Sequence, residues 1–422
     1  MIETRPQKTQ ERALLIGLEK EGVSKWDLQD SLAELRELAN SAGAEVVDTV
    51  TQKLQKPTAP YYIGRGKAES IKNSCQDRHV TSVIFDDELS PAQGRNLENL
   101  FARKVLDRTQ LILDIFAQRA RSREGRLQIE LAQLQYLLPR LTRMWHHLSR
   151  QTGGIGTRGP GETQLEVDRR RVQERIARLE RELEAVRKTR AIQRQGRKRH
   201  QWPVAAVVGY TNAGKSTLLN LLTGADVVTQ NKLFATLDPT TRSFVLPNKQ
   251  RVLLTDTVGF LRKLPHTLIE SFKATLEEVS EADLLIHIVD LSHPRVDEQM
   301  EAVDSVIKEL DAFGKQTLIV FNKIDNLPNR ELAESYVKRF PGSVAISART
   351  GEGVNKLVQT LENALSSWRL RSRLRIPSNE SALIAEIHRV GHVLELRYEG
   401  NDALIIAHVP PELAQKLERF AA

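Results

Sequence analysis

Eight consecutive residues, Gly209 to Ser216, have the types and spacing of a loop that binds phosphate groups. They read Gly-Tyr-Thr-Asn-Ala-Gly-Lys-Ser, follow the apolar run Val204–Val208 and precede the helix-forming run Thr217–Leu222. In a strand, loop and helix of this kind, backbone N–H groups and the helix N-terminus point at anionic oxygens. We expect Lys215 to reach the β- and γ-phosphates and Ser216 to offer its hydroxyl to Mg²⁺. A chance glycine turn is the alternative, which the flanking strand and helix disfavour.

The run Asn322-Lys323-Ile324-Asp325 is expected to select the base. It follows the strand-like run Thr317–Phe321 and begins 107 residues after Lys215. An Asp carboxylate accepts hydrogen bonds from both guanine N1–H and the exocyclic amine, a pair of donors that adenine does not offer. A simple turn is the alternative, because Asn and Asp are common in turns. The position at a strand end, where α/β sheets bind ligands, favours guanine recognition.

Two shorter segments are expected to complete the nucleotide site. The strand-like run Val252–Thr255 ends in Asp256-Thr257-Val258-Gly259, where Asp256 can hold the Mg²⁺ shell and the Gly259 N–H can meet the γ-phosphate. Ser347-Ala348-Arg349 follows another apolar run, and its backbone groups could touch the guanine edge. The four segments stand in the order of GTP-binding proteins over about residues 202–366, which resembles a translation-factor-related GTPase.

A narrower resemblance is carried by three motifs. Leu233–Arg242 reads Leu-Phe-Ala-Thr-Leu-Asp-Pro-Thr-Thr-Arg, and Asp256–Phe260 reads Asp-Thr-Val-Gly-Phe. Gly153–Glu166 reads Gly-Gly-Ile-Gly-Thr-Arg-Gly-Pro-Gly-Glu-Thr-Gln-Leu-Glu. These motifs, and the order of segments over nearly the whole chain, resemble the HflX family of ribosome-associated GTPases. The match is weakest in roughly the first 100 and the last 55 residues.

The resemblance implies a function and a set of roles. It implies Mg²⁺-dependent hydrolysis of GTP to GDP and phosphate, action on the large ribosomal subunit and its RNA, and separation of stalled or idle ribosomes. We expect a monomer away from the ribosome. Thr236 would join Ser216 and Asp256 on Mg²⁺, and Lys215, Thr236 and Gly259 would be catalytic. The residues expected to contact the nucleotide are Gly209, Tyr210, Thr211, Asn212, Ala213, Gly214, Lys215, Ser216, Thr217, Phe234, Ala235, Thr236, Leu237, Asp238, Asp256, Thr257, Val258, Gly259, Asn322, Lys323, Ile324, Asp325, Ser347, Ala348 and Arg349.

Phe260 departs from the pattern of many GTPases, which place a water-orienting Gln directly after this glycine. A phenyl ring cannot orient water by hydrogen bonding. Catalysis is therefore expected to depend on Mg²⁺, Lys215 and the switch backbone, with another group holding the attacking water.

The bulk composition favours a soluble protein of several domains. A chain of 422 residues is too long for one core, and 40% hydrophobic with 27% charged residues is typical of globular proteins. No apolar run approaches the roughly 20 residues that span a bilayer, and Met1–Pro6 lacks the apolar core of a signal peptide. Cys75 is the only cysteine, which excludes an internal disulfide and argues against cysteine-based zinc. A reducing cytoplasm fits, and we interpret His146-His147 as helix surface.

Basic charge is concentrated in one-fifth of the chain. Residues 119–200 contain 21 Lys or Arg and 9 Asp or Glu, a local charge of +12, so the remainder carries −4 of the total +8. A solvated charged helix is the alternative. The basic residues are almost all arginine, which suits bidentate contact with phosphate, so we expect nucleic acid as the partner.

Two apolar stripes of equal length predict an antiparallel coiled-coil hairpin. Each alternates steps of 4 and 3 over 21 positions, about 32 Å at the helical rise. Pro139 should bend the first arm. The connecting stretch Gly153–Gly161 has five glycines, which permit close backbone approach, so we interpret it as a probe rather than a passive connector. The stripes are Leu127, Leu131, Leu134, Leu138, Leu141, Trp145 and Leu148, and then Leu165, Arg169, Val172, Ile176, Leu179, Leu183 and Val186.

The predicted fold class is α/β. Strand-like Arg12–Leu18, Glu45–Val47 and Thr81–Phe85 alternate with helix-like Trp26–Ala42 and a helix starting at Ser90-Pro91, which implies a parallel sheet. The expected segments are an N-terminal α/β domain (1–118), a basic hairpin with its tip and a linker at 187–200 (119–200), a P-loop GTPase domain (201–367) and a small C-terminal α/β domain (368–422).

The last segment is expected to pair the strands Val393–Tyr398 and Ala403–Ala407 through the turn Glu399–Asp402, with a final helix beginning at Pro410. Two other functions stay open. One is an ATP-driven RNA remodeller using the N-terminal domain, which no second Gly-Lys-Ser loop supports. The other is a GTP-binding scaffold without significant turnover.

Overall fold

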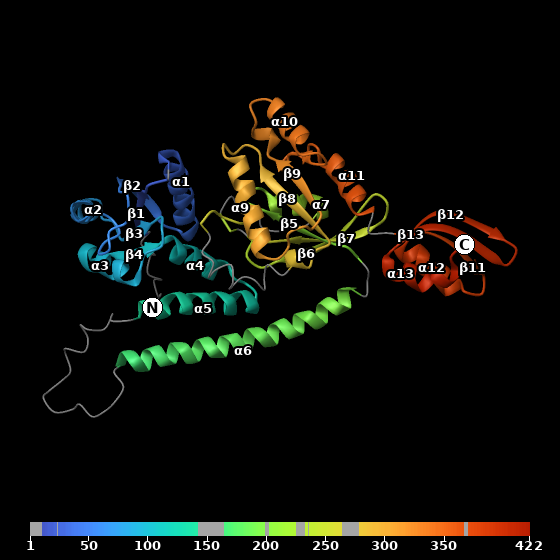
Figure 1. Ribbon diagram of the computed structural model, residues 1–422, viewed down its shortest axis with the longest axis horizontal. Helices are drawn as coiled ribbons and strands as arrows, with labels where there is room; N and C mark the ends of the chain where they lie inside the picture. The colour runs from blue at the N-terminus through green and yellow to red at the C-terminus, as the bar shows by residue number, and fades with distance from the viewer. Residues whose placement is uncertain are drawn as a thin grey trace, which may run out of the picture. The chain divides into compact units, whose positions relative to one another are not determined.

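The computed structural model describes residues 11–22, 24–141, 164–198, 202–224, 233–234, 236–263, 278–366 and 370–422. The chain divides into two compact units (Figure 1). Unit 1 comprises Met1–Ala185, Lys232–Phe234 and Leu264–Ser271. Unit 2 comprises Val186–Asn231, Ala235–Lys263 and Phe272–Ala422. Both contain parallel sheets with helices, which confirms the predicted α/β class.

Unit 1 is built on a four-stranded parallel sheet in the order β2-β1-β3-β4. The predicted alternation of strands and helices is confirmed. The elements are β1 (Arg12–Glu19), α1 (Lys25–Ala42), β2 (Glu45–Lys53), α2 (Arg65–Asp77), β3 (Ser82–Phe85), α3 (Pro91–Phe101), β4 (Lys104–Asp107) and α4 (Arg108–Arg119).

Local sequence explains where these elements begin. β1 is buried from Ala13 to Leu18, as expected for a central parallel strand covered on both faces. A Ser24 hydroxyl accepts from the Asp27 N–H at 3.1 Å and starts α1. α3 begins as predicted at Ser90-Pro91, because the Ser90 hydroxyl accepts from the Gln93 N–H at 3.2 Å.

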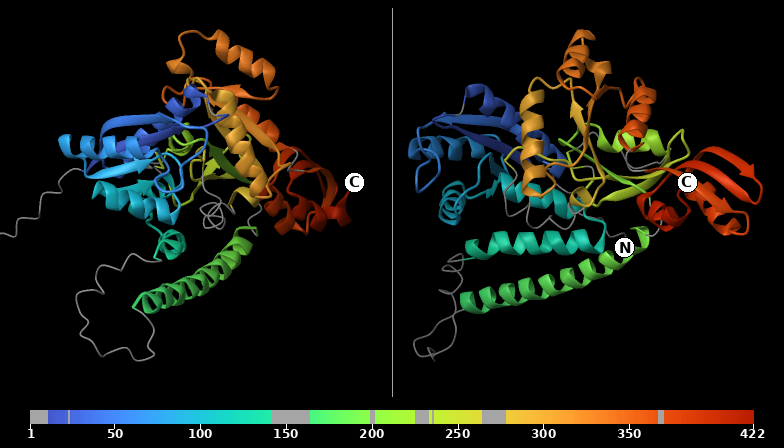
Figure 2. Two further views of the ribbon diagram at one scale, coloured as in Figure 1. Left: turned by 60° about the vertical axis from the view of Figure 1, so that its left-hand side comes forward. Right: turned by 45° about the vertical axis from the view of Figure 1, so that its right-hand side comes forward.

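Two further helices form the described part of the predicted hairpin. α5 (Arg123–Leu137) and α6 (Gln164–Lys198) run side by side in Figures 1 and 2. The Arg175 guanidinium donates to both Glu130 carboxylate oxygens, at 2.7 and 2.9 Å. Leu179 and Leu183 of the second stripe are buried. The structure therefore confirms that the second stripe is helical and that its helix, α6, pairs with α5, which carries the start of the first stripe.

The hairpin differs from the prediction in two places. Pro139 lies in a 3-10 turn, η1 (Leu138–Arg140), that ends α5 rather than bending a continuous helix. The proline ring removes one N–H and clashes with the preceding turn. The segment interpreted as a basic linker, 187–200, is helical as far as Lys198. The tip Gly153–Gly161 and the end of the first stripe lie outside the described residues.

Unit 2 contains a six-stranded sheet in the order β10-β9-β8-β5-β7-β6, parallel except for β6. An apolar core of Val, Leu, Ile and Ala side chains packs between the sheet and its helices. The elements are β5 (Val204–Gly209), α7 (Lys215–Thr223), β6 (Thr240–Val245), β7 (Arg251–Asp256), β8 (Leu284–Asp290), α9 (Val296–Glu309), β9 (Thr317–Asn322), η2 (Ile324–Asn326), α10 (Glu331–Arg339), β10 (Val344–Ala345) and α11 (Val354–Ala364).

The end of the chain forms a three-stranded antiparallel sheet in the order β11-β13-β12. The predicted strand pair is confirmed as β12 (His392–Glu399) and β13 (Asp402–Val409), and Pro410 precedes α13 (Pro411–Leu417). β11 (Leu370–Pro377) and α12 (Ser381–Val390) were not predicted. In the part of the chain that the structure describes, no helix has the length and apolarity that crossing a bilayer requires.

A buried ion pair in unit 1 gives a test of the fold. Arg108, 3% exposed in its side chain, donates to Asp86 at 2.9 Å and to Glu34. Arg108→Met would leave the Asp86 carboxylate buried without its cation, which should cost about 3–5 kcal/mol. Hydrogen exchange of the β1 and β3 amides measures this loss as a lower free energy of opening.

Two variants serve as controls for that measurement. Adding Asp86→Asn to Arg108→Met removes the stranded charge and should restore much of the stability. Lys53→Met breaks a pair with Glu19 in which the lysine side chain is 83% exposed, and should cost less than about 1 kcal/mol. An Arg108→Met variant no less stable than Lys53→Met would contradict the account.

Candidate functional site

The phosphate loop lies between β5 and α7, as its sequence predicts. Lys215 is buried, and its ammonium donates to the carbonyls of Gly209 at 3.1 Å and Tyr210 at 2.8 Å. An ammonium has three N–H donors, and these two bonds fix the direction of the side chain. Burial lowers the pKa of Lys215 to about 8. The other predicted members of this loop, placed beside it, are Thr211, Asn212, Ala213, Gly214, Ser216 and Thr217.

Asn322 connects the phosphate loop to the base loops. Its side chain is buried, its amide donates to the Ala213 carbonyl at 2.8 Å, and its Oδ1 accepts from the Ala348 N–H at 2.9 Å. Gly214 has φ +100°, and a Cβ there would lie 2.2 Å from Asn322 Nδ2. Only glycine therefore leaves room for this brace. The sequence placed Asn322 at the base, and the structure adds its contact with the phosphate loop.

The predicted base-binding residues gather at the carboxyl end of β9. Asp325 is partly buried in η2, beside the loop that starts at Ser347. The two segments are tied together, because the Ile324 N–H donates to the Ile346 carbonyl at 3.3 Å. Ser347 is buried, whereas Arg349 is exposed. Asp325 and the loop that starts at Ser347 therefore lie on neighbouring segments joined by a hydrogen bond.

The three predicted metal ligands converge on one point. The Ser216 and Thr236 hydroxyls donate to Asp256 Oδ2 at 2.6 and 2.9 Å, and they are 2.8 Å from each other. Asp256 is fully buried, and its Oδ1 makes no hydrogen bond within the described residues. Burial raises the pKa of this carboxyl, while Lys215 lowers it. An all-oxygen set around a buried carboxylate fits a hard divalent cation such as Mg²⁺.

The predicted first-switch segment is divided between the units. Phe234 belongs to unit 1, where its ring centroid lies 4.5 Å from that of Phe116. Leu237 is also buried. Thr236 reaches the metal ligands, and Asp238 is partly buried. Ala235 lies outside the described residues.

The second-switch segment starts against the phosphate loop. The Thr211 N–H donates to the Phe260 carbonyl at 2.8 Å, and the Phe260 N–H donates to the Gly209 carbonyl at 3.2 Å. The Phe260 side chain is only 2% exposed, and Thr257 and Val258 are buried as well. The ring that replaces the usual Gln is thus packed in the interior, where it has no access to an attacking water.

Sequence reasoning missed two polar residues near this site, the partly buried Asp290 and the buried His287. Asp290, at the end of β8, accepts from the Lys323 ammonium at 2.6 Å, and its position at a strand end was an available signal. His287 of the same strand is 2% exposed, and burial lowers its pKa to about 4, so it is neutral near pH 7. The continuous apolar run around His287 in β8 gives no sign of a buried polar group.

The chain is similar in sequence to known GTP-binding proteins. Three family models match the chain. "GTP-binding GTPase N-terminal" covers residues 29–117, "GTP-binding GTPase Middle Region" covers 119–197 and "50S ribosome-binding GTPase" covers 204–323. A solved GTP-binding protein from Sulfolobus solfataricus in complex with GDP is 26% identical, with a TM-score of 0.45 over 85% of this chain and 99% of its own.

Curated relatives are closer in sequence. GTPase HflX of Caldanaerobacter subterraneus subsp. tengcongensis is 46% identical over 413 residues, which is 98% of this chain and 94% of the relative. GTPase HflX of Escherichia coli (strain K12) is 47% identical over 365 residues, or 86% and 85% of the two chains. Identity at this level over nearly the whole length confirms the resemblance seen in the motifs, and the chain belongs to the HflX family of GTPases.

Proposed function

We propose that this GTPase is Mg²⁺-dependent, acts on the large ribosomal subunit and separates stalled or idle ribosomes. The observation that carries the catalytic part is the convergence of Ser216, Thr236 and Asp256 beside the Lys215 ammonium. The ribosomal part is supported by the description of the family model over residues 204–323 and by the family membership. We place the protein in the cytoplasm, as a monomer when it is not on the ribosome.

The residues of the site have separate tasks in this proposal. Ser216, Thr236 and Asp256 would hold Mg²⁺, which when bound neutralises charge on the β- and γ-phosphates. Lys215 stabilises negative charge that develops on the phosphate oxygens, from a position fixed by the Gly209 and Tyr210 carbonyls. The Gly259 N–H donates to the γ-phosphate.

Asp325 selects guanine in the same scheme. Asn322 and Lys323 hold the loop that carries it, through their bonds to Ala213, Ala348 and Asp290. The remaining predicted contacts, from Ser347 to Arg349, bring backbone groups to the guanine edge. The buried hydrogen bonds of Asn322 keep this end of the site rigid, so the base binds without rearrangement of the protein.

The RNA contact is assigned to the basic segment 119–200. α6 carries most of its arginines, and the ion pair between Arg175 and Glu130 holds it against α5. We propose that Gly153–Gly161 is the contacting end of this arm. We also propose that the four domains are separated at 118/119, 200/201 and 367/368. The boundary at 200/201 falls between the end of helix α6 at Lys198 and the next described strand, which begins at Val204.

Base selection by Asp325 is tested with one substitution. Asp325→Asn should weaken GTP binding by about 1–3 kcal/mol, because guanine would lose its acceptor pair. Xanthosine triphosphate should bind better, since its extra carbonyl suits an amide donor. Calorimetric titration of both nucleotides measures the switch, with Asp311→Asn, in a turn after α9, as a matched control. Equal wild-type affinity for ATP and GTP would defeat the assignment and favour the ATP-driven alternative.

The arm is tested by shortening Gly153–Gly161 to a four-residue turn. GTP affinity should stay the same, whereas stimulation of hydrolysis by large ribosomal subunits should fall sharply. Subunit binding should weaken less and should decline steeply with salt, because arginines along α6 still meet phosphates. Single-turnover hydrolysis with and without subunits measures the effect. Unchanged stimulation would make the loop a passive spacer, and no turnover in either protein would favour the scaffold.

A further inference from the structure

A tyrosine of the phosphate loop holds the second-switch segment at a point beyond Phe260. The Arg262 N–H donates to the Tyr210 hydroxyl at 2.8 Å. Tyr210 is 7% exposed, and this bond is partly buried. The same two segments are already joined by the backbone bonds of Phe260 to Gly209 and Thr211. The side-chain bond therefore extends a short backbone pairing by two residues.

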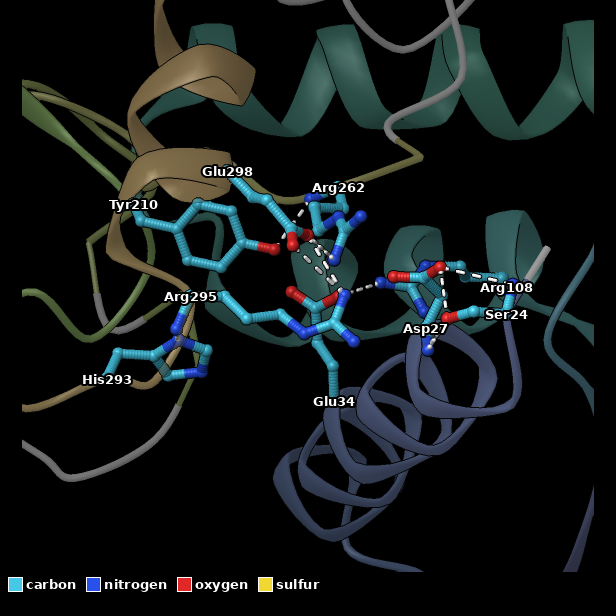
Figure 3. Close-up of polar contacts among 9 residues, drawn as sticks. All are labelled: Ser24, Asp27, Glu34, Arg108, Tyr210, Arg262, His293, Arg295 and Glu298. Carbon is cyan, nitrogen blue, oxygen red and sulfur yellow. Dashed lines mark hydrogen bonds and ion pairs between the residues drawn. The ribbon is translucent and has the colours of Figure 1, made fainter. Parts of the chain in front are cut away.

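The other side of Arg262 is held by helix α9. Its guanidinium lies 2.9 Å from a Glu298 carboxylate oxygen, and Glu298 also pairs with Arg295 at 3.0 Å. The Arg295 N–H in turn donates to His293 Nδ1 at 3.1 Å. Figure 3 shows the Tyr210 hydroxyl and the Glu298 carboxylate converging on Arg262. Arg262 is thus fixed by its backbone to the phosphate loop and by its side chain to α9.

Gly259 is the residue whose placement depends on these contacts. A Cβ at Gly259 would lie 2.8 Å from Thr211 Cα and 3.0 Å from Lys215 Nζ. Its backbone therefore already rests against the phosphate cradle, three residues before Arg262. Misplacement by 1 Å of a group that acts on the transition state can lower the rate by about 100-fold.

We propose that Tyr210 is a positioning residue for GTP hydrolysis, which acts by fixing the Arg262 peptide and so the backbone of Gly259 beside Lys215. Many GTPases have a Gln that orients water directly after this glycine. Here Phe260 is buried and cannot do so. The backbone of the second-switch segment must then do more to position the reacting groups. The Tyr210 hydroxyl is the side-chain group that holds this backbone in place. The hydroxyl is bonded to the Arg262 peptide, so it acts through the backbone rather than on the reacting atoms.

The test is Tyr210→Phe, which keeps the ring and its packing and removes only the hydroxyl. We expect kcat for GTP to fall about fivefold, the size expected for loss of one hydrogen bond. KM for GTP and the affinity for GDP should each change less than about twofold, because the loop backbone and Asp325 are untouched. Tyr336→Phe is the matched control, since its hydroxyl lies 3.4 Å from Asp297 in the same unit, and it should leave kcat unchanged.

A second variant, Glu298→Gln, weakens the other anchor of Arg262 and should also lower kcat. Tyr210 and Glu298 both hold Arg262, one through its backbone and the other through its side chain. The double variant Tyr210→Phe with Glu298→Gln should therefore lower kcat by less than the product of the two single effects. The proposal is overturned if Tyr210→Phe hydrolyses GTP at the wild-type rate. It is also overturned if GDP affinity and thermal stability fall in step with kcat, since the tyrosine would then act only in packing. A double variant whose loss of kcat equals the product of the two single losses would overturn it as well.

Discussion

The buried carboxylate of Asp256 joins two separate segments of the chain, and the proposed metal site depends on it. Two hydroxyls from different segments, Ser216 and Thr236, donate to a single oxygen of that carboxylate, while the other oxygen has no hydrogen bond within the described residues. A buried charge of this kind is costly unless a cation balances it. Lys215 supplies part of the balance, as its effect on the pKa of Asp256 indicates. A divalent cation would supply the rest, so the arrangement of the first switch is linked to metal and nucleotide.

The two ends of the nucleotide site are built differently. At the base end, Asn322 ties the phosphate loop to the Ala348 loop with fully buried hydrogen bonds, which makes a rigid frame. At the phosphate end, the second switch is held by main-chain pairing and by Tyr210 and Glu298, and no water-orienting Gln follows Gly259. In the proposed function this rigid frame holds the guanine base, while the buried Phe260 ring cannot position water. A protein of this design is suited to control by a partner that completes the geometry.

Much of this could be predicted from the sequence, because the phosphate and base motifs consist of residues whose chemistry depends on local spacing. Lys215 and Ser216 follow a strand, and their loop geometry needs only neighbouring residues. The parallel sheet of unit 1 was equally accessible, since alternating strands and helices allow few topologies. The end of α5 at Pro139 was not predicted correctly, because the apolar stripe continues across a residue that cannot continue the helix. Contacts between distant segments, such as Asn322 with Ala213 or Arg262 with Tyr210, leave no periodic signal and required the structure.

The contacts of Ser216 and Thr236 with Asp256 imply that this carboxylate would organise the site around a divalent cation. The most direct measurement is the rate at which a fluorescent, non-hydrolysable GTP analogue leaves the protein, with Mg²⁺ and with a chelator, for the wild type and for Asp256→Asn. Removing Mg²⁺ should speed release from the wild type about tenfold or more, because the ion would be held by Ser216, Thr236 and Asp256 and would offset the negative charge of the phosphates. Release from Asp256→Asn should be fast and nearly insensitive to Mg²⁺. A wild-type release rate that is the same with Mg²⁺ and with chelator would contradict the claim.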